Sequence, residues 1–110
     1  MANIPRIEYP RPQLRRGNWM NLNGKWMFEI DNGKSGRARG LVGAETLSGE
    51  IILPFCPESE LSGVGNKDFM ASVWYKRSVT LKKEEGRRII LHIDACDYAC
   101  EVWVNGRSCG

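Results

Sequence analysis

Short runs of alternating apolar and polar residues, separated by turn-forming residues, are the feature that most limits what this chain can fold into. Residues 25–31 show it most clearly, with Trp26, Phe28 and Ile30 on one face of an extended chain and Met27 on the other. Further strands are predicted over residues 49–54, 71–81, 87–94 and 98–104. Because no segment follows a convincing helical period, the pattern predicts an all-β fold, either an antiparallel sandwich or a barrel.

Turn signals separate these strands. Asn23-Gly24 and Asn105-Gly106 are typical of hairpin turns, residues 31–40 form a Gly-rich charged loop, and residues 41–47 could form a short helical turn. The second Asn-Gly pair is followed only by residues 107–110, which predicts a hairpin that lacks its second arm and a sheet with an unpaired edge. We therefore expect the chain to be a fragment of a larger domain, truncated before its last strands.

Length and charge exclude several classes of function. The chain has 110 residues, which is typical of one domain, and its 16 Lys+Arg against 13 Asp+Glu give a net charge of +3. Because this charge is small and the basic residues form no stripe with interleaved aromatics, we predict no nucleic-acid partner. The N-terminus lacks the apolar core of a signal peptide and no run could span a bilayer, so the prediction is a cytoplasmic protein without a membrane partner.

The N-terminal residues differ from the rest of the chain. Pro5, Pro10 and Pro12 fix the backbone and remove hydrogen-bond donors, so residues 1–18 are predicted to form an extended arm. The arginines of this arm are interpreted as solvated rather than as an anion site. Residues 19–110 are predicted to form the partial β-sandwich.

The four cysteines do not suggest a disulfide or a metal site. Cys96 and Cys100 would lie about 13 Å apart on one strand, beyond the range of a disulfide. A zinc site would need further ligands, and His92 is the single histidine of the chain. We therefore expect reduced cysteines that act as small apolar residues, with no metal and no cofactor.

Known catalytic patterns are absent from the sequence. There is no Ser-His-Asp pattern, no phosphate-binding loop and no dinucleotide fingerprint. His92 on an alternating strand is interpreted as structural. Glu58 with Glu60, and Asp94 with Asp97, are pairs of acids that nothing local holds across a sugar, so they are interpreted as solvated. The prediction is a chain with no catalytic residue of its own.

The tryptophans could stack on sugar rings or pack in a core. Trp26, Trp74 and Trp103 fall inside the strand patterns, where core packing is the usual role. Trp19, which neighbours Arg16 and Asn18, is predicted to be more open.

Four stretches of the chain together resemble glycoside hydrolase family 2. The family's W-x-x-L-N-G-x-W-x-F stretch is matched by Trp19, Leu22, Asn23, Gly24, Trp26 and Phe28. A P-F-x-P-E-S-x-L-S-G stretch is matched by residues 54–63, and the "VWYKRSVTL" and "RIILHIDACDYACEVWVNG" stretches resemble two later strands of the family. The matches cover nearly all of the chain after the first dozen residues, in order and at the right spacings.

The resemblance implies a jelly-roll-like antiparallel β-sandwich that is galactose-binding-domain-like: the N-terminal sugar-binding domain of β-galactosidase or β-glucuronidase-like enzymes. In the family, an immunoglobulin-like domain and a TIM barrel follow, and the barrel holds the two catalytic glutamates of a retaining hydrolase of O-glycosidic bonds. The family's H-x-G-G-Y-x-P-F stretch, which continues the domain, is missing here, in agreement with a fragment. The implied partners are a carbohydrate substrate, the remaining domains of the parent chain and further copies in a homo-oligomer.

The resemblance also indicates a site. In related enzymes the loop that matches residues 54–65 reaches towards the barrel, so Glu58, Ser59 and Glu60 are predicted to bind substrate in the complete enzyme. Some β-galactosidases have an asparagine where this chain has Glu60. In the chain alone, this loop is expected to be loosely ordered. A stand-alone carbohydrate-binding module and a structural or interaction β-domain remain alternative functions.

Overall fold

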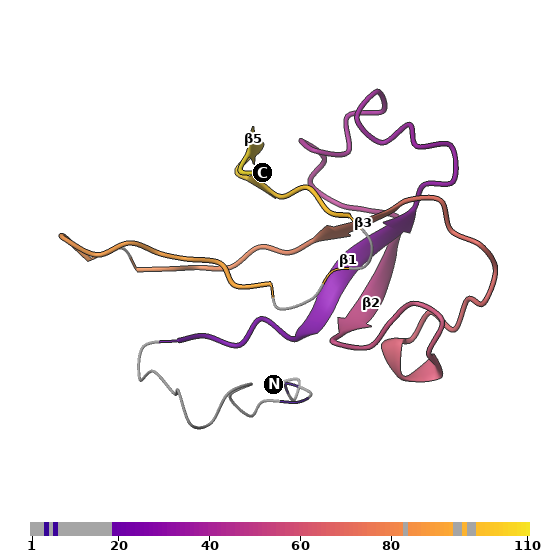
Figure 1. The fold of residues 1–110 in the computed structure, drawn as a ribbon, viewed down its shortest axis with the longest axis horizontal. Helices are drawn as coiled ribbons and strands as arrows, with labels where there is room; N and C mark the ends of the chain where they lie inside the picture. The colour runs from indigo at the N-terminus through magenta and orange to yellow at the C-terminus, as the bar shows by residue number, and fades with distance from the viewer. Residues whose placement is uncertain (1–3, 5, 7–18, 83, 94–95, 97–98) are drawn as a thin grey trace. The chain divides into compact units, whose positions relative to one another are not determined.

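The computed structural model describes residues 4, 6, 19–82, 84–93, 96 and 99–110 (Figure 1). The chain divides into two units, residues 1–77 and residues 78–110, and each is described by itself. The described residues form five strands in two antiparallel sheets and one turn of 3-10 helix. The prediction of an all-β fold is thus confirmed.

The first unit is built on a three-stranded sheet in the order β2–β1–β3. Strand β1 (Gly24–Ile30) lies in the centre and pairs antiparallel with β2 (Gly49–Leu53) and β3 (Val73–Lys76) (Figure 1). Strands β1 and β2 match the sequence prediction within a residue at each end. The central strand β1 has a hydrogen-bonded neighbour on each edge.

One face of this sheet carries the core. Trp26 lies opposite Ile51, and Phe28 lies between Gly49 and Tyr75 in the two ladders. Phe28 and Ile51 are the buried apolar side chains among the described residues, at 4% and 1% exposure. The rings of Phe28 and Tyr75 meet edge to face, with their centroids 5.3 Å apart. The predicted face of β1 is therefore the packed one.

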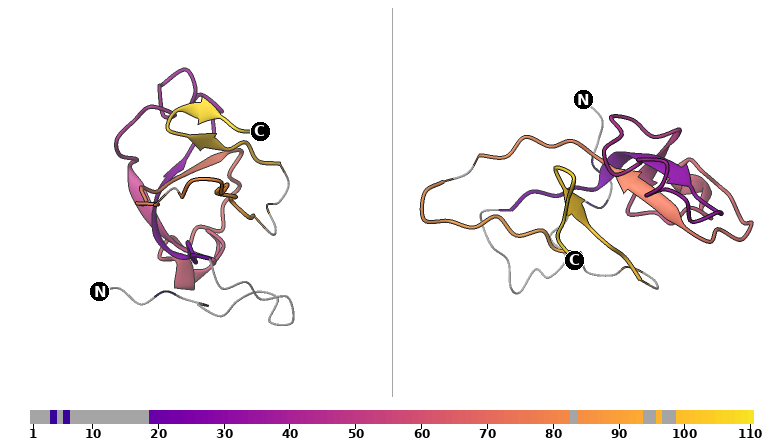
Figure 2. Two further views of the ribbon diagram at one scale, coloured as in Figure 1. Left: turned by 90° about the vertical axis from the view of Figure 1, so that its left-hand side faces the viewer. Right: turned by 90° about the horizontal axis from the view of Figure 1, so that it is seen from above.

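The second unit contains a small hairpin, drawn in yellow in Figure 2, formed by β4 (Trp103–Val104) and β5 (Arg107–Ser108). Asn105 and Gly106 both have positive φ, at 51° and 80°, as a two-residue hairpin turn requires. Beyond the turn, the Cys109 N–H donates to the Val102 carbonyl at 2.7 Å. The prediction that this hairpin lacks its second arm is wrong, because residues 107–108 supply it.

Three of the predicted strands are shorter than expected or do not form. Of residues 71–81, only β3 is a strand, and of the described part of 98–104, only β4 is. Residues 87–93, which carry a strong alternating pattern, form no strand, and the last residue of that prediction lies outside the described part. Alternation makes a strand favourable, but a strand also needs a neighbour for its backbone hydrogen bonds, and no described strand pairs with these residues.

Other sequence predictions have mixed outcomes. The region of residues 41–47 contains turns, including one closed by the Ala44 N–H and the Leu41 carbonyl, and no helix. The arm of residues 1–18 lies outside the described residues except for Ile4 and Arg6. In the part of the chain that is described, no helix has both the length and the apolar character needed to cross a membrane.

Because the core is small, one apolar side chain should contribute much of the free energy of unfolding. Replacing Ile51 with alanine leaves a cavity beside its cross-strand partner Trp26, and we expect it to lower the free energy of unfolding by about 2–5 kcal/mol. Ile52, the next residue of β2, points to the other face and is only half-buried. As the matched control, Ile52→Ala should cost about 1 kcal/mol. Urea unfolding followed by tryptophan fluorescence measures both, and equal losses would contradict the assigned core face.

Candidate functional site

The loop of residues 54–65, which contains the predicted site, folds around the 3-10 helix η2 (Glu60–Ser62). Ser59 caps this helix: its backbone is extended, and its Oγ accepts a hydrogen bond from the Leu61 N–H at 3.1 Å. Gly63 ends the helix with φ of 85°, and its N–H donates to the Glu60 carbonyl at 3.0 Å. A serine before the turn and a glycine after it explain why the helix begins and ends where it does.

Internal hydrogen bonds close the loop. Ser62 is fully buried; its hydroxyl donates to the Ser59 carbonyl at 2.7 Å and accepts from the Val64 N–H at 3.1 Å. The Ser59 carbonyl also accepts from the Gly65 N–H at 3.2 Å, and the Asn66 N–H reaches back to the Pro57 carbonyl at 3.0 Å. The sequence predicted a loosely ordered loop, whereas the structure shows a loop closed by its own hydrogen bonds. No sequence pattern indicated that Ser62 would be buried in it.

The structure places the three predicted site residues on this loop in two different settings. Glu58 and Glu60 are exposed to solvent. Ser59 is half-buried, and its oxygen is engaged in the cap of η2. The two carboxylates are therefore available to a partner, whereas Ser59 positions the backbone between them.

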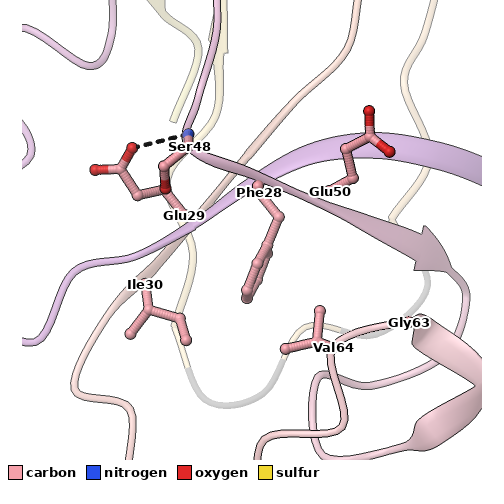
Figure 3. Close-up of a pocket in the computed structure, with 8 residues that line it drawn as sticks. Phe28, Glu29, Ile30, Ser48, Glu50, Gly63 and Val64 are labelled. Carbon is pink, nitrogen blue, oxygen red and sulfur yellow. Dashed lines mark hydrogen bonds between the residues drawn. The ribbon is translucent and has the colours of Figure 1, made fainter.

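A shallow pocket of about 330 Å³ lies beside this loop (Figure 3). Its lining residues come from β1, the start of β2 and the end of the loop: Phe28, Glu29, Ile30, Ser48, Gly49, Glu50, Gly63 and Val64. In Figure 3 the side chains of Phe28, Ile30 and Val64 lie on one side of the strands, and the carboxylates of Glu29 and Glu50 lie on the other. The part of the pocket wall formed by Phe28, Ile30 and Val64 is thus apolar, and the predicted residues Glu58, Ser59 and Glu60 do not line the pocket.

Asp31, at the end of β1, collects several hydrogen bonds. It is 3% exposed. One oxygen, Oδ1, accepts from the Ser35 N–H at 2.9 Å, and the other, Oδ2, accepts from the Gly36 N–H at 2.7 Å and from the indole N–H of Trp74 at 3.1 Å. Arg39 approaches Oδ1 at 3.4 Å. Asp31 therefore joins the loop after β1 to strand β3.

This environment determines the protonation state of Asp31. The hydrogen bond from the Ser35 N–H, helped by those from Trp74 and Gly36 and opposed by burial, lowers its pKa from 3.8 to about 2. Nearby, Glu29 pairs with Arg39 at 2.8 Å and accepts from the Ser48 N–H, and these contacts lower its pKa. A carboxylate that stays ionised and has its oxygens occupied does not serve as a proton donor or acceptor, so this network is structural.

Sequence reasoning missed the Asp31 network, although a signal was present. An aspartate followed by Asn32-Gly33 is typical of a turn in which the side chain accepts from backbone N–H groups a few residues on. The involvement of Trp74, 43 residues away, had no signal in the sequence. The sequence predicted that Trp74 packs in the core. In the structure it is half-buried, and its indole N–H donates a hydrogen bond to Asp31.

A second polar contact secures the start of β1. The Leu22 carbonyl accepts from the indole N–H of Trp26 at 2.7 Å and from Nη1 of Arg77 at 2.6 Å. The same Arg77 nitrogen donates to the Asn23 carbonyl at 3.2 Å, and the Asn23 N–H donates to Oδ1 of Asn21. The residues of the first family-like stretch thus act together to hold the chain as it enters the sheet.

The remaining candidates do not assemble into a site. No disulfide joins the cysteines, and all four are exposed rather than packed as small apolar residues: Cys56, Cys96, Cys100 and Cys109. His92 is also exposed. Across the described residues, no three potential ligands come close enough to hold a metal ion. No protein-family model matches the sequence.

The low pKa of Asp31 predicts a specific acid sensitivity. Because the folded pKa is below the unfolded one, Asp31 stabilises the fold fully above about pH 4 and loses this effect as the pH falls towards about 2. Asp31→Asn keeps one acceptor but turns an NH2 group towards backbone donors, so it should be less stable at pH 7 and lose less stability on acidification. Urea unfolding at pH 7, 4 and 2.5 measures this.

Asp68→Asn, which changes an exposed acid of the same unit, is the matched control for Asp31→Asn. It should follow the unchanged protein at every pH. If Asp31→Asn also retained the full loss of stability between pH 4 and pH 2.5, the carboxylate would not be the titrating group.

Close packing of Gly36 against Trp74 gives a second prediction. A Cβ at Gly36 would overlap the indole ring, whereas one at Gly43 would meet nothing within 4 Å. We expect Gly36→Ala to cost about 1–3 kcal/mol and to shift the tryptophan emission, because the ring must move. Gly43→Ala should stay within about 0.5 kcal/mol of the unchanged protein. Equal stability of the two variants would show that the Trp74 contact is not tight.

Proposed function

We propose that this chain is part of the N-terminal sugar-binding domain, a jelly-roll-like β-sandwich, of a glycoside hydrolase family 2 enzyme. The parent enzyme would hydrolyse O-glycosidic bonds in carbohydrate metabolism, as β-galactosidases do. The chain itself is non-catalytic in this proposal, since the acid/base and nucleophile glutamates belong to the barrel of the parent. The observation that carries the proposal is the occurrence of four family-like stretches in order and at matching spacings.

The positions of those stretches in the fold support the proposal. The first holds the start of β1 through Leu22, Trp26 and Arg77 and supplies Phe28 to the core. The second forms the closed loop around η2. The third contains β3, and the fourth ends in β4 and its Asn105-Gly106 turn. Residues of the first two stretches are therefore ones on which the first unit depends.

Glu58, Ser59 and Glu60 are the proposed substrate-binding residues. Exposure leaves the two carboxylates able to accept hydrogen bonds from sugar hydroxyl groups. The cap formed by Ser59 restricts the backbone between them, which reduces the entropy lost when a ligand binds. In the same proposal the partners are the carbohydrate, the other domains of the parent and further copies of it, and the protein is cytoplasmic.

A stand-alone carbohydrate-binding module is the second candidate, and one observation favours it. Phe69 is 86% exposed, and an exposed aromatic ring can stack on the apolar face of a pyranose. Titration of the chain with galactosides and glucuronides, followed by calorimetry and tryptophan fluorescence, separates the two candidates. We expect no binding; saturable binding that Phe69→Ala abolishes would favour the module.

The main proposal is tested on the complete protein that contains this chain. We expect it to hydrolyse chromogenic β-galactosides or β-glucuronides, and Glu60→Ala to lower kcat/KM by roughly 10–100-fold, as expected for the loss of a hydrogen bond to a charged group. Glu45→Ala, which removes an exposed acid from a turn, is the control. Unchanged kinetics of Glu60→Ala on every substrate would refute the site, and no hydrolysis of any O-glycoside would refute the function.

A further inference from the structure

The loop of residues 54–65 uses most of its backbone N–H groups in hydrogen bonds of its own. Between residues 59 and 66, every N–H except that of Glu60 donates to an oxygen of residues 56–62. The pairs are Ser59 to the Cys56 carbonyl, Leu61 to Ser59 Oγ, Ser62 and Gly65 to the Ser59 carbonyl, Gly63 to the Glu60 carbonyl, Val64 to Ser62 Oγ, and Asn66 to the Pro57 carbonyl. The loop therefore has few N–H groups left to donate to a ligand.

The charged groups of this loop are carboxylates. Glu58 and Glu60 are exposed, and neither forms an ion pair with a described residue. Exposed glutamates are negatively charged at neutral pH, and a carboxylate accepts hydrogen bonds but donates none. Lys67, the first cation after the loop, is followed directly by Asp68, so residues 54–68 keep a net negative charge. The loop thus presents acceptors and negative charge to a ligand.

We propose that this loop selects for glycosides whose sugar carries no acid group, and against uronides such as β-glucuronides. The hydroxyl groups of a neutral sugar can donate to Glu58 and Glu60, whereas the carboxylate of a uronide has no proton to donate and is repelled by both. Binding an anionic sugar requires N–H donors or cations, and the donors of this loop are occupied. The inference rests on the proposed function and narrows its substrate class.

The closed form of the loop prevents it from adapting to an anion. The Ser59 carbonyl accepts from the Ser62 N–H at 3.3 Å, from the Ser62 hydroxyl at 2.7 Å and from the Gly65 N–H at 3.2 Å. A Cβ at Gly65 would lie 3.9 Å from Cγ of Glu60, so the stem of that side chain lies over the loop. The loop cannot turn its N–H groups outwards without breaking several of these hydrogen bonds.

Matched pairs of chromogenic substrates test the selection on the complete protein that contains this chain. A β-galactoside and a β-galacturonide differ only in whether the sugar ends in a hydroxymethyl group or a carboxylate, as do a β-glucoside and a β-glucuronide. We expect the neutral member of the hydrolysed pair to have the higher kcat/KM. In Glu58→Gln and Glu60→Gln, which keep an acceptor oxygen, the ratio of neutral to acidic kcat/KM should fall by about 2–10-fold for each charge removed. Glu45→Gln, the control, should leave the ratio unchanged.

Ionic strength gives an independent measurement. Because salt screens repulsion between exposed charges, the ratio for the unchanged protein should fall as sodium chloride is added, and the variant with both substitutions should respond less. Circular dichroism checks that each variant keeps the fold. A higher kcat/KM for the acidic substrate, or a ratio that neither substitution changes, would overturn this inference and leave the hydrolase activity in place. If no O-glycoside were hydrolysed, the proposed function would fail and this inference with it.

Discussion

Most of the first unit depends on the hydrogen bonds that the carboxylate of Asp31 accepts. It ends β1, collects the N–H groups of Ser35 and Gly36, and reaches Trp74 on β3, while its own backbone N–H donates to the Ser72 carbonyl at 2.8 Å. A charged acceptor makes stronger hydrogen bonds than a neutral one, and here they converge on one buried group. The long loop between β1 and β2 is held to the sheet by this group, so strand pairing and loop conformation depend on each other.

The two units differ in how many polar side-chain contacts accompany their strands. Among the described residues of the first unit, Phe28 and Ile51 are the buried apolar side chains, and the polar contacts of Asp31 and Arg77 accompany them. In the second unit residues 87–93 also carry a strand pattern, but no described strand pairs with them, and the contacts of Arg87 with Glu84 lie within the preceding turn. Ile89, Ile90, Leu91 and Ile93 remain exposed there.

The candidate site lies where a polar loop meets an apolar pocket in the first unit. Gly63 and Val64 end the η2 loop on the pocket side, whereas Glu58 and Glu60 face solvent. The buried hydroxyl of Ser62 fixes this arrangement through two hydrogen bonds within the loop. If the proposed parent enzyme presents this loop to a sugar, the carboxylates are the groups free to meet it, and the serines hold them in place.

The sequence by itself determined the strand class, the positions of β1 and β2, the packed face that contains Phe28, and the Asn105-Gly106 turn, because alternation and turn chemistry act between near neighbours. It also indicated the loop that contains Glu58 and Glu60. Only the tertiary structure decided that Asp31 would meet Trp74, that Ser62 would be buried, and that residues 87–93 would form no strand. Each of these outcomes depends on which groups, distant in sequence, lie beside a residue in the fold. A hydrogen bond or a strand pair stabilises the structure only when both partners are in place.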